Sequence, residues 1–253
     1  MAGEGGRDYE QDLYTKMNQA GVVPEGFTPA GSASNAADMQ FYAKNEPWNL
    51  ELKNSSSLLD FGQSVIEYSG SSWRLSGTNP VMVELLRGLG VETIVNENWG
   101  EPHKKTRQSV TVQEAIEDVQ NFRDKYVKNI SVNNVIRYYN SKNTYYIQIE
   151  GRGLYYMGSK AGVANPAGIP EIPELSGTYK VRLRRKSLDT STLRNDLPGT
   201  PYKKGYVVRG TKAGIPFDKK TELPGAYNFT TAFQADTLPA KSPINLDNIL
   251  DWL

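Results

Sequence analysis

Cysteine is absent from the sequence of 253 residues, and histidine occurs once. Without cysteine, the chain can form neither a disulfide framework nor a thiolate metal site. A single histidine leaves almost no room for a zinc enzyme or for a Ser/His/Asp triad. Any catalysis by this chain would therefore depend on carboxylates and lysine.

Long apolar runs are missing too, since no stretch approaches the ~18 apolar residues that a membrane-spanning helix needs. The first residues, MAGEGGRDYEQDLY, are polar and acidic and unlike a signal peptide. We therefore expect an intracellular protein, in the cytoplasm or, if viral, in the host cytoplasm. A hydrophobic share of 38% and a charged share of 23% are typical of a globular chain. The length of the chain suits one elaborated domain or two small ones.

Charge is unevenly distributed, although the net charge is only +1. Residues 1–101 contain 6 Lys and Arg against 14 Asp and Glu, a balance of −8, whereas residues 102–253 contain 23 against 14, a balance of +9. An acidic part is suited to cations and a basic part to phosphates, although an ordinary solvated surface can show the same imbalance.

The apolar pattern predicts helices and strands in mixed order. A helix over 7–20 is followed by strands at 37–43 and 48–53 and by a helix from about 54 to 68. The later expected elements are helices over 79–89, 111–128 and 133–139, a strand at 91–95, two strands within 145–158, strands at 178–187 and 205–210, and a short helix at 245–253.

Three charged residues share one side of the predicted hairpin. The apolar residues of both strands, such as Met39 and Leu50, occupy one face, and alternation places Asp38, Glu51 and Lys53 on the other. These three are either ordinary surface residues or the edge of a catalytic site.

Hydrolysis of a phosphodiester needs a nucleophile made from water and a sink for charge, and a divalent cation supplies both. Magnesium prefers carboxylate oxygens, and a nearby lysine helps to stabilise developing charge. Asp38 and Glu51 fit as ligands of Mg2+ or Mn2+, beside Lys53. The carbonyl of Leu52 could add an oxygen, and Glu10 on the first helix could add a third carboxylate.

This order of residues resembles the PD-(D/E)xK nuclease superfamily, and is most similar to the archaeal-type Holliday junction resolvases. The resemblance covers roughly residues 7–70 and consists of a helix glutamate, the loop GSASNAAD and the strand LELK. It implies that Asp38 and Glu51 bind Mg2+, that Glu10 supports them, and that Lys53 positions the attacking water.

The same resemblance includes the loop at 31–38 and the segment FGQSVIEY at 61–68. Ser32 matches the family's loop serine near the scissile phosphate, and Ser34 and Asn35 of the same loop are further candidates for binding DNA. Gln63 in FGQSVIEY resembles the glutamine of related exonuclease branches, although Tyr68 follows it at a longer spacing than theirs.

Basic and aromatic residues of the C-terminal part suggest a nucleic-acid partner. The basic candidates for contacts with the DNA backbone are Arg182, Arg184, Arg185, Lys186, Lys203 and Lys204. A strand edge defended by charge would look the same. The tyrosine pairs at 138–139, 145–146 and 155–156 either stack on unpaired bases or, more simply, belong to strands and core.

Together these observations predict an α/β protein with a restriction-endonuclease-like core, whose mixed central sheet is flanked by helices. The core would occupy 1–158, with a helical insertion at about 79–140, and a basic, β-rich extension would occupy 159–253. The predicted function is that of a metal-dependent DNA nuclease of resolvase or restriction type. We expect it to cut DNA at branched, flapped or site-specific structures and to work as a homodimer. The alternatives are an exonuclease acting on DNA ends and a DNA-binding or assembly protein without turnover.

Overall fold

The chain divides into two compact units, each built from separate segments. The structure is a computed structural model that describes residues 4–29, 37–54, 59–103, 110–122, 125–174, 177–185, 206–209, 212–216, 222–223, 227–235 and 239–247. The first unit takes 1–62, 129–178 and 233–253, and the second takes 63–128 and 179–232. Both units therefore combine segments from either side of residue 158, where the sequence pattern suggested a boundary.

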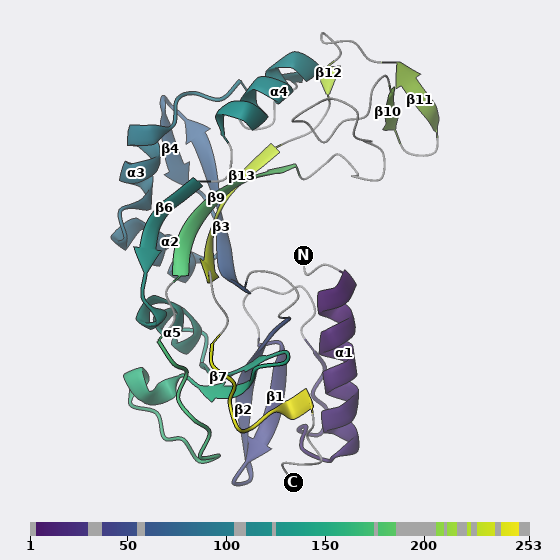
Figure 1. Cartoon of the computed structure of the whole chain (residues 1–253), viewed down its shortest axis with the longest axis vertical. Coiled ribbons are helices and arrows are strands. Elements are labelled where there is room, and N and C mark those ends of the chain that lie inside the picture. The colour runs from purple at the N-terminus through teal and green to yellow at the C-terminus, as the bar shows by residue number, and fades with distance from the viewer. Residues whose placement is uncertain are drawn as a thin grey trace. The chain divides into compact units, whose positions relative to one another are not determined.

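Helices and strands alternate irregularly along the chain (Figure 1). The helices are α1 (Glu4–Gln19), α2 (Pro80–Gly88), α3 (Val91–Asn98), α4 (Val112–Asn121), α5 (Val132–Asn140) and the 3-10 helix η1 (Gly158–Ala161). The strands are β1 (Met39–Ala43), β2 (Glu46–Lys53), β3 (Leu59–Ser69), β4 (Ser72–Leu75), β5 (Val110–Thr111), β6 (Lys125–Ile130), β7 (Thr144–Ile149), β8 (Gly153–Tyr156), β9 (Gly177–Arg185), β10 (Tyr206–Arg209), β11 (Lys212–Pro216), β12 (Glu222–Leu223) and β13 (Tyr227–Ala235).

A mixed four-stranded sheet forms the centre of the first unit. Its order is β1-β2-β7-β8, in which β1 and β2 pair antiparallel, β2 and β7 pair parallel, and β7 and β8 pair antiparallel. Parallel pairing of β2 and β7 requires a long crossover. Residues 54–143 provide it, and they include α5 immediately before β7.

Helix α1 covers one face of this sheet. Its side chains Tyr9, Leu13 and Met17 pack in one apolar cluster with Met39 and Leu50 of the hairpin. Their spacing of four residues gives the helix a single apolar stripe. The charged residues of the hairpin therefore face away from α1, as the strand alternation predicted.

The second unit is built mainly on a five-stranded sheet of order β4-β3-β13-β9-β6. Trp73 is almost completely buried and makes edge-on ring contacts with Trp99, Phe122 and Phe229. Such aromatic contacts add to the burial of apolar area and give this unit a core of its own.

The predicted α/β architecture is confirmed, with a mixed sheet flanked by helices and strands β9–β13 in the C-terminal part. Among the helices, α2 begins as expected, because Asn79 accepts a hydrogen bond from the Met82 N–H and Pro80 occupies the first turn. The tyrosines expected in the core are buried at positions 138, 139, 146, 155 and 156.

Three predicted elements are wrong. The helix expected over 54–68 is the strand β3. Ser64 and Ile66 are buried and Val65 between them is less buried, a period of two that pairing with β4 fixes. The strand expected at 91–95 is helix α3, because Val91 and Val95 are both buried one turn apart. The helix expected over 111–128 ends at Asn121, and the strand β6 begins at Lys125.

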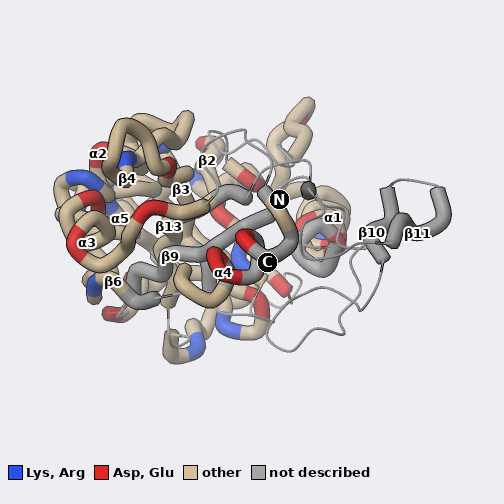
Figure 2. The backbone as a smooth tube through the Cα atoms, turned by 90° about the horizontal axis from the view of Figure 1, so that it is seen from above, with Lys and Arg blue, Asp and Glu red and all other residues tan. Residues whose placement is uncertain are grey.

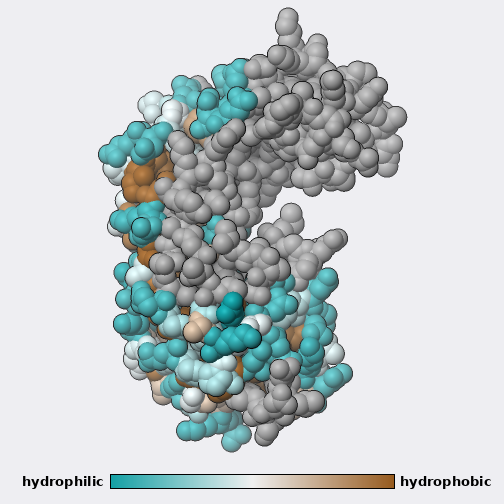
Figure 3. Space-filling view, viewed as in Figure 1, coloured by the Kyte–Doolittle hydropathy of each residue, from teal (hydrophilic) through white to brown (hydrophobic). Residues whose placement is uncertain are grey.

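The described surface is mostly hydrophilic on the face that Figure 3 shows. Acidic residues occur on α1 and α3 (Figure 2), in agreement with the acidic N-terminal part of the sequence. Within the described ranges, Tyr42 is the large apolar side chain that is clearly exposed. No described helix has both the length and the apolar composition to cross a membrane.

Replacing Leu13 by Ala tests the packing of α1 on the hairpin. Leu13 is 1% exposed, so we expect the free energy of unfolding to fall by about 2–5 kcal/mol in urea denaturation. The neighbouring Asp12→Ala is the control, because Asp12 is exposed and forms a surface ion pair with Lys16, and it should change the free energy by no more than about 0.5 kcal/mol. Equal, small losses for both variants would contradict this packing.

Candidate active site

The antiparallel register of β1 and β2 brings Asp38 to Glu51. Met39 lies opposite Leu50, and one further step along the hairpin places Asp38 opposite Glu51. Residues directly opposite in an antiparallel pair project from the same face. A hydrogen bond fixes this step, since the Leu52 N–H donates to Oδ2 of Asp38 over 2.9 Å.

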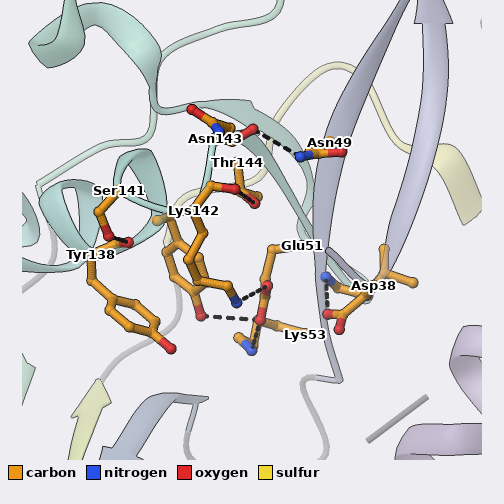
Figure 4. Close-up of polar contacts among 11 residues, drawn as sticks. Asp38, Asn49, Glu51, Lys53, Tyr138, Ser141, Lys142, Asn143 and Thr144 are labelled. Atoms are coloured by element: carbon orange, nitrogen blue, oxygen red, sulfur yellow. Dashed lines mark hydrogen bonds and ion pairs between the residues drawn. The ribbon is translucent and has the colours of Figure 1, made fainter. Parts of the chain in front are cut away.

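Glu51 is the centre of the contacts in Figure 4. Its Oε1 lies 2.5 Å from Nζ of Lys53 and accepts a hydrogen bond of 3.1 Å from the Tyr139 hydroxyl. Its Oε2 lies 3.8 Å from Nζ of Lys142. Because Tyr139 belongs to α5 and Lys142 to the turn after it, the segment before β7 covers the face of the sheet opposite α1.

Burial and neighbouring charges shift the pKa values of the site in different directions. Burial and then the Glu51 carboxylate raise the pKa of Asp38 to about 7, against the opposing effects of Lys53 and the Leu52 N–H. Burial also raises the pKa of Glu51, but Lys53 and Lys142 outweigh it and the pKa is lowered. Burial lowers the pKa of Lys53, but the two carboxylates outweigh it and the pKa is raised. Glu51 and Lys53 are therefore an ion pair, whereas positive charge compensates Asp38 only in part.

The oxygen atoms at this end of the hairpin are of the chemical type that binds a small divalent cation. Asp38 and Glu51 provide two carboxylates, and Oε2 of Glu51 is buried without a hydrogen bond. The N–H and C=O of one strand residue point to the same side, so the carbonyl of Leu52 faces the edge where Asp38 lies. Proteins hold Mg2+ with one or two carboxylates, waters and substrate phosphates, which this donor set matches.

Glu10 lies on α1, and its charge contributes to the raised pKa of Asp38. However, in the part of the chain that the structure describes, no three Asp, Glu, His or Cys side chains gather closely enough to hold one metal ion. The two hairpin carboxylates thus form the donor set without Glu10, and a supporting role for Glu10 stays a prediction.

The other predicted site residues belong to the second unit or lie outside the described residues. Gln63 is exposed on β3 in the second unit, on a strand and not on the expected helix. Arg182, Arg184 and Arg185 lie on β9 of the same unit. The candidates that lie outside the described residues are Ser32, Ser34, Asn35, Lys186, Lys203 and Lys204.

Two residues of the site were missed by sequence reasoning. The sequence pattern indicates a core or base-stacking position for Tyr139 and gives no indication of a role for Lys142. The order of elements could have indicated both residues if the pairing of β2 were known. A helix that leads into the strand beside the ExK strand has its last turn next to the hairpin. That the partner of β2 is β7 could not be read from the sequence.

No family model matches the sequence, and no curated protein matches it. Among solved structures, HhaI endonuclease in complex with DNA is similar, with 12% sequence identity, 97% of this chain and 96% of that chain covered, and a TM-score of 0.45. Likeness at this level establishes neither fold nor activity, so the function of this chain has to follow from its own residues.

Asp38→Asn should stabilise the metal-free protein at alkaline pH. Because folding raises the pKa of Asp38 from 3.8 to about 7, the associated stability is present below pH 3.8 and is lost as the pH rises through about 7. In EDTA at pH 8 we expect the variant to unfold with a free energy roughly 2–4 kcal/mol above that of the wild type. Denaturant titrations at several pH values measure this difference, and a gain that is equally large at pH 3.5 would contradict it.

Glu51→Gln should have the opposite effect. It leaves the Lys53 ammonium, with a side chain only 17% exposed, without its carboxylate, and breaking such a buried pair costs roughly 3–5 kcal/mol. Since the pKa of Glu51 is lowered, its stabilising effect is present above the ordinary value of 4.5 and declines as the pH falls. Glu46→Gln, at an exposed position of β2, is the matched control for the unfolding measurement. A Glu51→Gln variant as stable as this control at pH 7 would rule out the ion pair.

Proposed function

We propose that this chain is a metal-dependent nuclease that hydrolyses DNA phosphodiester bonds. The observation that carries the proposal is the meeting of Asp38, Glu51 and Lys53 at the end of one hairpin. The two carboxylates lie opposite each other and the ammonium is paired to one of them at 2.5 Å. Two acidic ligands for a cation and one lysine are the parts that hydrolysis of a phosphodiester requires.

Each residue has a distinct task in this proposal. Asp38, Glu51 and the Leu52 carbonyl would hold Mg2+ or Mn2+, which when bound supplies a Lewis acid and lowers the pKa of water. Lys53 is held by Glu51 and by burial, so its remaining N–H groups are fixed in direction. It would donate to the attacking water or to an oxygen of the phosphate, where negative charge develops.

The substrate form is part of the same proposal. The resemblance of residues 7–70 to archaeal-type Holliday junction resolvases favours branched or site-specific DNA. Two strands of a duplex need two sites, which a homodimer would supply by symmetry. The basic residues at 182–186 and 203–204 would then follow the DNA backbone.

Incubation with DNA tests the proposal directly. Supercoiled plasmid, linear duplex and a four-way junction are each mixed with the protein in Mg2+, Mn2+ or EDTA, and products are separated on gels. We expect cutting with either metal and none in EDTA. Asp38→Ala and Lys53→Ala should each reduce the rate by about 10²–10³-fold, because each removes a group that acts on the transition state.

Asp12→Ala is the control variant, since Asp12 is an exposed carboxylate of α1 that pairs with Lys16, and it should cut at the wild-type rate. Loss of linear but not circular DNA would identify an exonuclease. Binding to DNA without cutting in either metal would contradict the proposed enzyme activity and indicate a DNA-binding or assembly protein.

A further inference from the structure

The turn after α5 holds Lys142 in a defined place beside the hairpin. The Asn49 side chain donates to the carbonyl of Asn143 over 3.1 Å, which ties the turn to β2 (Figure 4). Within the turn, the Lys142 N–H donates to the carbonyl of Tyr139 over 2.9 Å, and the Ser141 hydroxyl donates to the carbonyl of Tyr138 over 2.6 Å. Such cross-links fix the direction in which the Lys142 side chain leaves the backbone.

The Lys142 side chain is largely enclosed, and no hydrogen bond links its ammonium to another described residue. The side chain is 10% exposed, and its Nζ lies 5.4 Å from the ring centre of Tyr138 and 5.5 Å from that of Tyr139. Its separation of 3.8 Å from Glu51 Oε2 exceeds the length of a hydrogen bond. An ammonium carries three N–H donors, and those of Lys142 are therefore open to an acceptor on a ligand.

Charge at this position points to an anion. Glu51 is the carboxylate within reach of both lysines, and Lys53 already holds its Oε1 at 2.5 Å. Lys142 is therefore the lysine without a short contact, and Asp38 and Glu51 together balance the two ammonium groups. A divalent cation held by these carboxylates would leave the site with an excess of positive charge, which suits an anion. The two tyrosine rings beside Lys142 favour a cation but neutralise none of its charge.

We propose that Lys142 is a second phosphate-binding residue of this site, whose ammonium donates to a non-bridging oxygen of the DNA backbone while Lys53 stays paired with Glu51. This inference rests on the proposed nuclease function and adds a residue that recognises the phosphodiester. Lysine suits that task as a point charge with three donors that need no fixed fork geometry.

Salt-dependent DNA binding tests this role, because each phosphate contact contributes about 0.9 to the slope of log K against log salt. We would measure binding of a labelled duplex in EDTA by fluorescence anisotropy, and kcat and KM for cutting in Mg2+. Lys142→Gln should weaken binding about 5–20-fold, lower the slope by about 0.9 and raise KM. Lys142→Arg keeps the charge and should stay within about threefold of the wild type.

Lys160→Gln is the matched control, because Lys160 is exposed on η1 in the same unit, and it should leave both slope and KM unchanged. If Lys142→Gln does not fold, Lys142→Met carries the same measurement. If the wild type cuts DNA and neutral variants at 142 keep its slope and affinity, the role of Lys142 is overturned and the nuclease stands. If the wild type neither binds nor cuts, the proposed function itself is lost.

Discussion

The register of one hairpin determines the chemistry of this protein. Met39 opposite Leu50 fixes Asp38 opposite Glu51, and the Leu52 N–H closes the step with a hydrogen bond to Asp38. A shift by one residue would turn every side chain to the other face and would bury the carboxylates against α1. The apolar cluster under α1 therefore does more than stabilise the unit, because it selects the register that brings two negative charges together.

Two like charges in a half-buried place need compensation, and the structure compensates them unequally. Glu51 receives Lys53, the Tyr139 hydroxyl and the field of Lys142, so it stays ionised. Asp38 receives one backbone N–H and the more distant Lys53, and its pKa rises to about 7. Pairs of titratable groups whose pKa values are driven apart are typical of functional sites, although structural ion pairs show such shifts as well. A cation bound between the carboxylates would remove the imbalance.

The sequence predicted the part of the site that depends on local alternation. Strand parity alone placed Asp38, Glu51 and Lys53 on one face, and helical spacing alone identified α1 and its buried stripe. Elements decided by distant pairing were not predictable in this way. Residues 59–69 carry enough apolar residues for a helix, and only pairing with β4 makes them a strand. Lys142 likewise depends on the parallel pairing of β2 with β7, which joins residues almost a hundred positions apart.

The central claim is that the paired carboxylates of the hairpin share one divalent cation. Diffraction from crystals soaked in Mn2+, with anomalous scattering to locate the ion, tests it most directly. The account predicts one ion bonded to oxygens of both Asp38 and Glu51, at about 2.0–2.5 Å, with the Leu52 carbonyl on the same side. Carboxylates that point apart, or an ion bound only elsewhere, would contradict it.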